Sequence, residues 1–212
     1  MRTRRYSLRG FIPRLATAGT MTLTTLVAAA LAASPGPRPV IEQLNATLLE
    51  VMQGADRLGY AGRYQQLEPV LRQSFNFPFM LRIAVGRARP DLSAEEQARL
   101  TEVFSEMSIA TFAARFDGYS DESFEIVAEG PAPRDGALIE TRIVRPAGEP
   151  VRLNYVMQPF DGRWRIIDVL SDAKYSELAR QRAEFTSILE KGGAQELIAT
   201  LEQKIDVLSD DR

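Results

Sequence analysis

Apolar residues recur every three or four positions in the first part of the chain beyond residue 40. Over residues 40–52 this spacing predicts one amphipathic helix. Between residues 56 and 86 the same spacing continues, but Pro69 and Pro78 interrupt it, and proline removes a helical backbone donor. The pattern therefore predicts two or three short helices that meet at angles.

A start signal for a longer helix follows. Ser93 is placed to cap the first turn, and Glu96 is placed to reach back to the backbone amide of Ser93. Apolar positions then continue at helical spacing to about Phe116, and Gly118 suits the left-handed residue that often ends a helix. This stretch predicts the longest helix of the chain.

After this helix the repeat of apolar positions changes from about 3.6 residues, typical of a helix, to two residues, typical of a strand. Four stretches of alternating residues are separated by turn-forming sequences such as Asp161-Gly162, and the stretches are "FEIVAE", "ALIETRIV", "VRLNYVMQPF" and "WRIIDVL". The connections are too short for parallel crossovers, so the strands form an antiparallel meander. After Asp172 the helical period returns on both sides of Gly192-Gly193. The predicted fold class is α+β, a four-stranded antiparallel meander sheet packed against several helices.

The third strand raises a functional question. Val151, Leu153, Tyr155 and Met157 lie on one face of it, because every second side chain of a strand points the same way. An apolar face of this kind fits either a filled core or the wall of a binding cavity. Periodicity alone leaves both readings open.

The amino-acid composition limits the classes of function that are possible for this chain. The chain has 212 residues, 45% hydrophobic and 25% charged, as expected for one globular domain. It contains neither cysteine nor histidine, which excludes thiol nucleophiles, disulfides, Cys/His zinc sites and imidazole catalysis. No phosphate-binding glycine loop, nucleophile elbow or calcium-loop spacing is present. Asp117, Asp168 and Glu140 are candidates for acid-base work, but nothing in the sequence pairs them.

The N-terminus predicts export. Five arginines precede an apolar, threonine-rich run that ends in small residues, with Ala30-Leu31-Ala32 as a cleavage pattern. We interpret residues 1–33 as a signal peptide. The stretch "TRRYSLR" also resembles the twin-arginine export pattern, although Ser7 stands where that pattern prefers a large apolar residue. Residues 34–39 are then a flexible lead and 40–212 a single domain. An uncleaved anchor is the alternative, since the run approaches the ~20 residues that span a bilayer.

Charge argues against two classes of partner. Removing the five N-terminal arginines changes the formal charge from -2 to -7. Nucleic acids and anionic membrane surfaces require clustered positive charge. We therefore expect no nucleic-acid partner and no stable membrane insertion after cleavage.

Several blocks in one order resemble the periplasmic phospholipid-shuttle family typified by MlaC, also known as toluene-tolerance auxiliary proteins. The resemblance covers about residues 40 to 208, and its blocks are "FPFMLRIAVGRA", "LSAEEQARLTEVFSEM", "PVRLNYVMQ", "GRWRIIDVL" and "EFTSILEKGGAQELIATLEQKI". The segment "YSELARQRAEF" further resembles the hopanoid-associated HpnM branch. Phe112 departs from the family, which often has tyrosine there.

The resemblance implies a periplasmic lipid carrier with no cofactor and no enzymatic activity. The implied cargo is a phospholipid or a hopanoid, and the implied partners are an inner-membrane lipid ABC transporter complex and an outer-membrane lipoprotein complex. It also implies an apolar cavity between sheet and helices. We expect that cavity to be lined by Phe79, Ile83, Phe104, Met107, Phe112, Ile139, Ile143, Val151, Leu153, Tyr155, Met157 and Ile166.

Two other classes make different predictions. An isomerase-like enzyme on a cone-shaped fold predicts an ionisable side chain deep in the pocket with a perturbed pKa. A structural periplasmic interaction module predicts a filled core and an exposed apolar patch.

Overall fold

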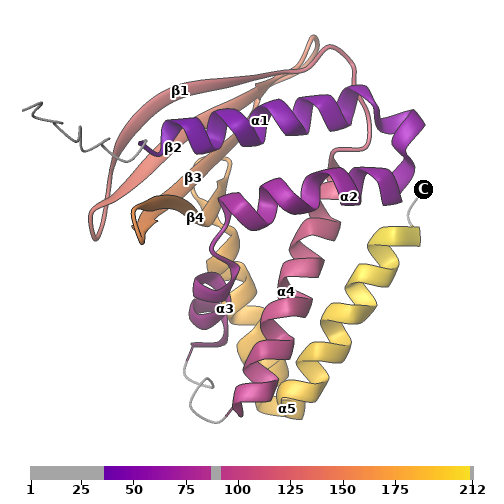
Figure 1. Cartoon of the computed structure of the whole chain (residues 1–212), viewed down its shortest axis with the longest axis vertical. Coiled ribbons are helices and arrows are strands. Elements are labelled where there is room, and N and C mark those ends of the chain that lie inside the picture. The colour runs from indigo at the N-terminus through magenta and orange to yellow at the C-terminus, as the bar shows by residue number, and fades with distance from the viewer. Residues whose placement is uncertain (1–35, 87–91, 211–212) are drawn as a thin grey trace, which may run out of the picture. The chain divides into compact units, whose positions relative to one another are not determined.

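A computed structural model describes residues 36–86 and 92–210 of the chain. The predicted signal peptide, residues 1–33, lies outside the described residues. Helices α1 and α2 form an antiparallel pair beside an antiparallel sheet (Figure 1). Helices α4 and α5 run side by side away from the sheet. The helices are α1 (Arg38–Gln53), α2 (Ala55–Ser74), α3 (Phe77–Val85), α4 (Ala94–Arg115) and α5 (Glu177–Asp210).

Helix α1 matches the helix predicted over residues 40–52, with one difference. Arg38 and Pro39 belong to it, so the predicted flexible lead, residues 34–39, is too long. Proline suits the first turn of a helix because the amide it lacks would have no partner there.

The two prolines between residues 56 and 86 behave differently. Pro78 lies in the first turn of α3, where the side chain of Asn76 accepts a hydrogen bond from the amide of Phe79 at 3.0 Å. The break between α2 and α3 lies at Phe75, which has extended backbone angles. Pro69 instead lies inside α2 without ending it, so the prediction that it interrupts a helix is wrong.

Helix α4 begins at the predicted capping box. The hydroxyl of Ser93 accepts from the amide of Glu96 at 3.1 Å, and the Glu96 carboxylate accepts from the amide of Ser93 at 2.8 Å. The helix ends at Phe116, whose φ is -103°. The prediction that Gly118 adopts the left-handed conformation is wrong, since its φ is not positive.

The sheet is an antiparallel meander in the order β1-β2-β3-β4-β5. Its strands are β1 (Ser123–Ala132), β2 (Gly136–Val144), β3 (Val151–Phe160), β4 (Arg163–Ser171) and β5 (Tyr175–Ser176). The four predicted strands are confirmed, and β5 adds a two-residue fifth. Asp161 and Gly162 both have positive φ, as the tight turn between β3 and β4 requires.

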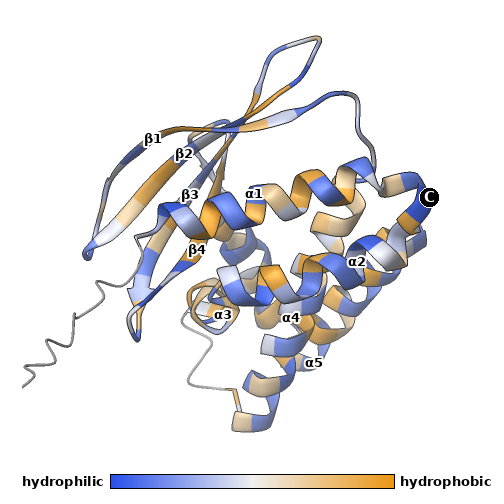
Figure 2. Cartoon of the chain, turned by 45° about the horizontal axis from the view of Figure 1, so that its top comes forward, coloured by the Kyte–Doolittle hydropathy of each residue, from blue (hydrophilic) through white to orange (hydrophobic). Residues whose placement is uncertain are grey.

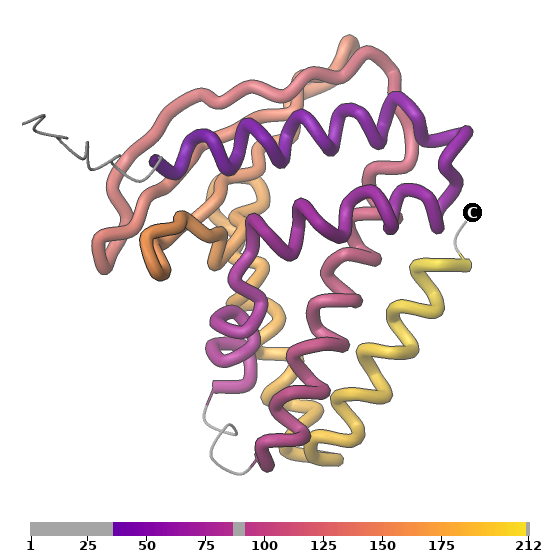
Figure 3. The backbone as a smooth tube through the Cα atoms, in the orientation of Figure 1, coloured from indigo at the N-terminus to yellow at the C-terminus, as the bar shows by residue number. Residues whose placement is uncertain are grey.

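Helix α5 is two helical arms joined at a bend. Gly193 has φ 68° and ψ -162°, a backbone conformation that glycine adopts far more readily than other residues. It divides the helix at the point where the sequence predicts the boundary between two C-terminal helices. The smooth trace in Figure 3 shows the second arm returning alongside the first. The bend therefore places both arms beside α4.

One end of the sheet is sealed by the junction of α2 and α3. Phe75 forms a parallel bridge with Ile166 of β4, and the amide of Asn76 donates to the carbonyl of Ile166 at 2.9 Å. Met157, the β3 partner of Ile166, is fully buried, as is Tyr155. Apolar and polar bands alternate along the helices in Figure 2, as expected for helices with one face in the core.

Asp168 of β4 organises the start of α5. Its carboxylate accepts hydrogen bonds from the amides of Val169 and Leu178 at 2.8 and 3.0 Å, and from the hydroxyl of Ser176 at 2.6 Å. The Ser176 hydroxyl in turn accepts from the amide of Ala179. This carboxylate, a candidate for acid-base work from sequence, is thus occupied by structural hydrogen bonds.

Candidate functional site

A cavity of about 720 Å³ lies between the open end of the sheet and helices α3, α4 and α5. This volume is within the range of pockets that bind small molecules. The sheet contributes Ile143 from the end of β2, Val151 and Leu153 from the start of β3, and Val169 from the end of β4. The sheet residues that line the cavity therefore lie toward the opposite end of β3 from Met157, which is not among the lining residues.

The buried part of the cavity wall is mostly apolar. Its buried apolar residues come from the α2–α3 junction, α3, α4, β2 and α5, and they are Phe75, Phe77, Met80, Met107, Phe116, Ile143 and Phe185. The rings of Phe75 and Phe77 are stacked with centroids 5.5 Å apart, and Phe112 contacts Phe75 edge-on at 5.7 Å. These aromatic pairs give the wall a defined shape.

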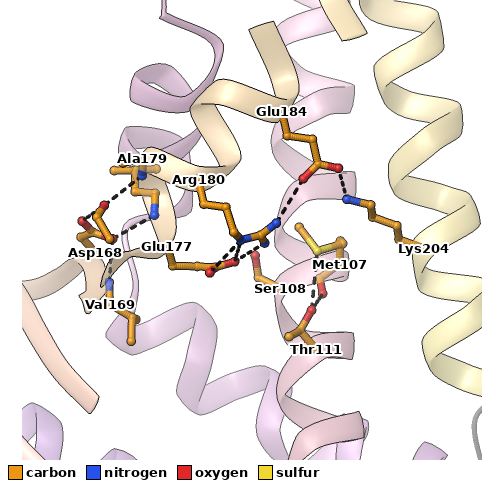
Figure 4. A network of polar contacts seen from close by, with 12 residues as sticks. Met107, Ser108, Thr111, Asp168, Val169, Glu177, Ala179, Arg180, Glu184 and Lys204 are labelled. Carbon is orange, nitrogen blue, oxygen red and sulfur yellow. Dashed lines mark hydrogen bonds and ion pairs between the residues drawn. The ribbon is translucent and has the colours of Figure 1, made fainter. Parts of the chain in front are cut away.

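Charged side chains form a chain of ion pairs along the cavity on α5. Arg180 donates to the carboxylate of Glu177, and it also contacts Glu184 at 3.3 Å between Nη1 and Oε2. Glu184 pairs in turn with Lys204, which lies on the other arm of α5. Figure 4 shows this chain crossing from one arm of the helix to the other. All four residues line the cavity, and Arg115 of α4 lines it beside them.

The ionisation of Glu177 follows from this chain. The hydrogen bond from Arg180 lowers the pKa of Glu177, and the nearby charges of Arg180, Arg115 and Lys204 act in the same direction against partial burial. The carboxylate is therefore ionised and neutralised at neutral pH. A general base needs a pKa near the working pH, so this lowering moves Glu177 away from such a role.

Five of the residues predicted from sequence line this cavity. They are Met107, Phe112, Ile143, Val151 and Leu153. They come from α4, β2 and β3, and β1 separates α4 from the two strands along the chain.

The other seven predicted residues do not line the cavity. Phe104, Ile139, Tyr155, Met157 and Ile166 are fully buried in the core. Burial raises the pKa of the Tyr155 hydroxyl, which is therefore neutral. Phe79 and Ile83 lie on the face of α3 away from the cavity, where the ring of Phe79 packs against Phe160 at 5.3 Å. Tyr155 and Met157 share a face of β3 with Leu153. They lie further along the strand, where both side chains are fully buried in the core.

Several lining residues were missed from the sequence. Phe77 and Met80 are spaced three apart and continue through Leu81 and Ala84 as one helical face, a signal that was present in "FPFMLRIAV". Phe75 has an extended backbone conformation between two helices. It therefore belongs to no helical repeat of apolar residues that could have predicted its place in the wall. Gln181 stands three residues after Leu178 and four before Phe185, a polar residue within an apolar stripe.

Within residues 36–86 and 92–210, no cluster of three or more aspartate or glutamate residues is placed to hold a metal ion. In the same residues, no helix is long and apolar enough to cross a membrane.

Comparisons with known proteins identify a family from the sequence and a shared fold from a solved structure. The family model described as MlaC protein matches residues 42–203. A solved structure of the phospholipid-binding protein from Ralstonia solanacearum in complex with a phospholipid superposes with a TM-score of 0.72 at 18% sequence identity. The superposition covers 82% of this chain and 99% of that one. At this identity the likeness shows a shared fold. No curated protein sequence matches the chain.

Proposed function

Because the chain belongs to the MlaC protein family, we propose that it is a periplasmic carrier that binds one phospholipid in the cavity between its sheet and helices. The observation that carries this proposal is the amphipathic wall of that cavity. Aromatic and aliphatic side chains form its buried part, while Glu177, Arg180 and Lys204 lie toward solvent. A phospholipid has the same division between hydrocarbon and charged head group.

Hydrocarbon burial supplies the affinity for such a cargo. Each CH₂ group moved from water into the apolar wall contributes roughly 0.8 kcal/mol, so even part of one acyl chain gives stable binding. The phospholipid in the Ralstonia solanacearum protein, which shares this fold, supports the same role for this cavity.

Lipid exchange requires partners in this proposal. The sequence has no nucleotide-binding motif, so transport energy comes from outside the chain. The partners we propose are an inner-membrane lipid ABC transporter complex and an outer-membrane lipoprotein complex. A hopanoid is the alternative cargo, and the resemblance of residues 175–185 to the HpnM branch favours testing it directly.

We propose binding rather than catalysis for this site. Glu177, Arg180, Glu184 and Lys204 of the wall neutralise one another in ion pairs. Asp168 is held by backbone and hydroxyl donors. The filled core expected for a purely structural module is not observed, since the cavity has a volume of about 720 Å³.

The proposed function is tested by native mass spectrometry of the purified protein, followed by organic extraction and lipid analysis. We expect a mass increment equal to one phospholipid, with about one phospholipid extracted per protein. A hopanoid in the extract would replace the phospholipid as cargo. Protein that is reproducibly free of lipid, also after incubation with phospholipid vesicles, would contradict the carrier function.

A further inference from the structure

Arg115 is a cation of the cavity wall that the chain of ion pairs on α5 leaves out. It is the last residue of α4, it lines the cavity, and it is exposed to solvent. The two wall cations on α5, Arg180 and Lys204, are each paired with a carboxylate of the same helix. Within residues 36–86 and 92–210, Arg115 takes part in no ion pair. Its guanidinium is therefore available to an anion in the cavity.

Two independent observations place the side chain of Arg115 toward the cavity. Met107, Thr111 and Arg115 follow one another at intervals of four residues, and residues four apart lie on the same face of a helix. Met107 and Thr111 both line the cavity, and both lie beside the ion pairs of α5 in Figure 4. The pKa of Glu177, another wall residue, is lowered mainly by the hydrogen bond from Arg180, and the charge of Arg115 adds to the lowering. The guanidinium therefore acts on the interior of the cavity.

Arg115 lies where the apolar wall of α4 meets solvent. Phe112 and Phe116 line the cavity on either side of it, and their rings are stacked with centroids 5.7 Å apart. Phe116 is buried and Phe112 is half-buried, whereas Arg115 is exposed. An acyl chain that packs against these two rings brings the polar group at its end to the level of Arg115.

The remaining arginine of the wall, Arg152, is less suited to this role. It stands between Val151 and Leu153, which both line the cavity. Because successive side chains of a strand point to opposite faces, Arg152 points to the other face of β3. Its partner in the neighbouring strand is Arg142, which is paired with Glu125 on that face.

We propose that Arg115 binds the phosphate of the lipid head group. A guanidinium presents its N–H donors in a planar fork that matches two oxygens of a phosphate. The phosphodiester of a phospholipid has two unesterified oxygens that share one negative charge, so it meets both the charge and the donors of Arg115. The site then favours phospholipids over uncharged lipids with the same acyl chains. This inference rests on the proposed function, because it requires a lipid in the cavity.

The test is loading of the purified protein from vesicles that contain equal amounts of phosphatidylglycerol and diacylglycerol with identical acyl chains. These two lipids differ in the head group alone, and the phosphate carries the charge of phosphatidylglycerol. Bound lipid is quantified by mass spectrometry after the protein is separated from the vesicles. We expect phosphatidylglycerol to be preferred by about tenfold, the lower limit for a hydrogen bond to a charged group.

The variant that tests the residue is Arg115→Gln, which removes the charge and keeps a polar side chain in an exposed position. We expect it to load both lipids without preference. Arg115→Met, which keeps an unbranched side chain without the charge, should lose the preference in the same way. Arg57→Gln is the matched control, since Arg57 is exposed on α2 and does not line the cavity. It should keep the preference of the unmodified protein, and thermal unfolding should show that all three variants are folded.

The outcomes separate this inference from the function on which it rests. Equal loading of the two lipids by the unmodified protein overturns the role of Arg115 and leaves the carrier function standing. A preference that persists in Arg115→Gln, or one that is lost equally in Arg57→Gln, does the same. If the unmodified protein loads neither lipid, or binds inorganic phosphate alone, both the inference and the carrier function are overturned.

Discussion

Replacing Leu153 with aspartate is expected to abolish phospholipid retention while leaving the protein folded. Leu153 lines the cavity and is only half-buried. A carboxylate there remains hydrated as long as the cavity admits water, but acyl chains would have to displace that water. Burying an unpaired charge costs several kcal/mol, so we expect affinity to fall by more than about a hundredfold.

This effect is measured as lipid extracted per folded protein, with the melting temperature as a check on folding. We expect the melting temperature to stay within about 5 °C of the unmodified protein, since each kcal/mol shifts it by roughly 2–4 °C at this size. Val127→Asp is the matched control, an aspartate on a strand residue that is exposed and outside the cavity. A folded Leu153→Asp protein with a full lipid load would show that this wall does not hold the cargo.

Replacing Met157 with aspartate is expected to prevent folding. Met157 lies on the same face of β3 as Leu153, but it is fully buried and does not line the cavity. Its cross-strand neighbour Ile166 is covered by the α2–α3 junction. The carboxylate would be enclosed without a cation, at a cost of more than about 4 kcal/mol.

The measurement is the yield of soluble protein and its thermal unfolding. We expect little soluble protein, or a melting temperature lowered by at least about 8 °C. A Met157→Asp protein that melts like the unmodified one but has lost its lipid would place Met157 in the binding site. The contrast with Leu153 would then disappear.

These two residues illustrate how far the sequence predicts the site. The alternation of β3 correctly places Leu153 and Met157 on one face, because strand periodicity is local. Which end of that face is covered depends on the bridge between Phe75 and Ile166, two segments distant in the chain. No local pattern encodes that contact, so sequence alone assigns core and cavity residues to a single set.

The helical part of the site shows a different limit. Phe79 was expected in the cavity, whereas Phe77 and Met80 line it. Which face of α3 is turned toward the cavity depends on the residue at which the helix begins. Pro78 in the first turn fixes that start. The capping box of Ser93 predicts the start of α4 well, because both of its hydrogen bonds join residues three apart.

The bent C-terminal helix could be anticipated only in part. Gly192-Gly193 predicts two helical segments, and the structure has them. That the second arm returns to close the cavity, with Lys204 reaching Glu184, depends on the direction of the bend. The charged side of the site therefore arises from tertiary structure.

The central claim is that acyl chains occupy the cavity between sheet and helices, and photo-crosslinking tests it most directly. The protein is loaded with a phospholipid that carries a diazirine near the end of one acyl chain, irradiated, and mapped by peptide mass spectrometry. We predict crosslinks on buried or half-buried wall residues such as Met80, Phe112 and Leu153. Crosslinks confined to exposed apolar residues such as Val127 and Tyr119 would contradict the account.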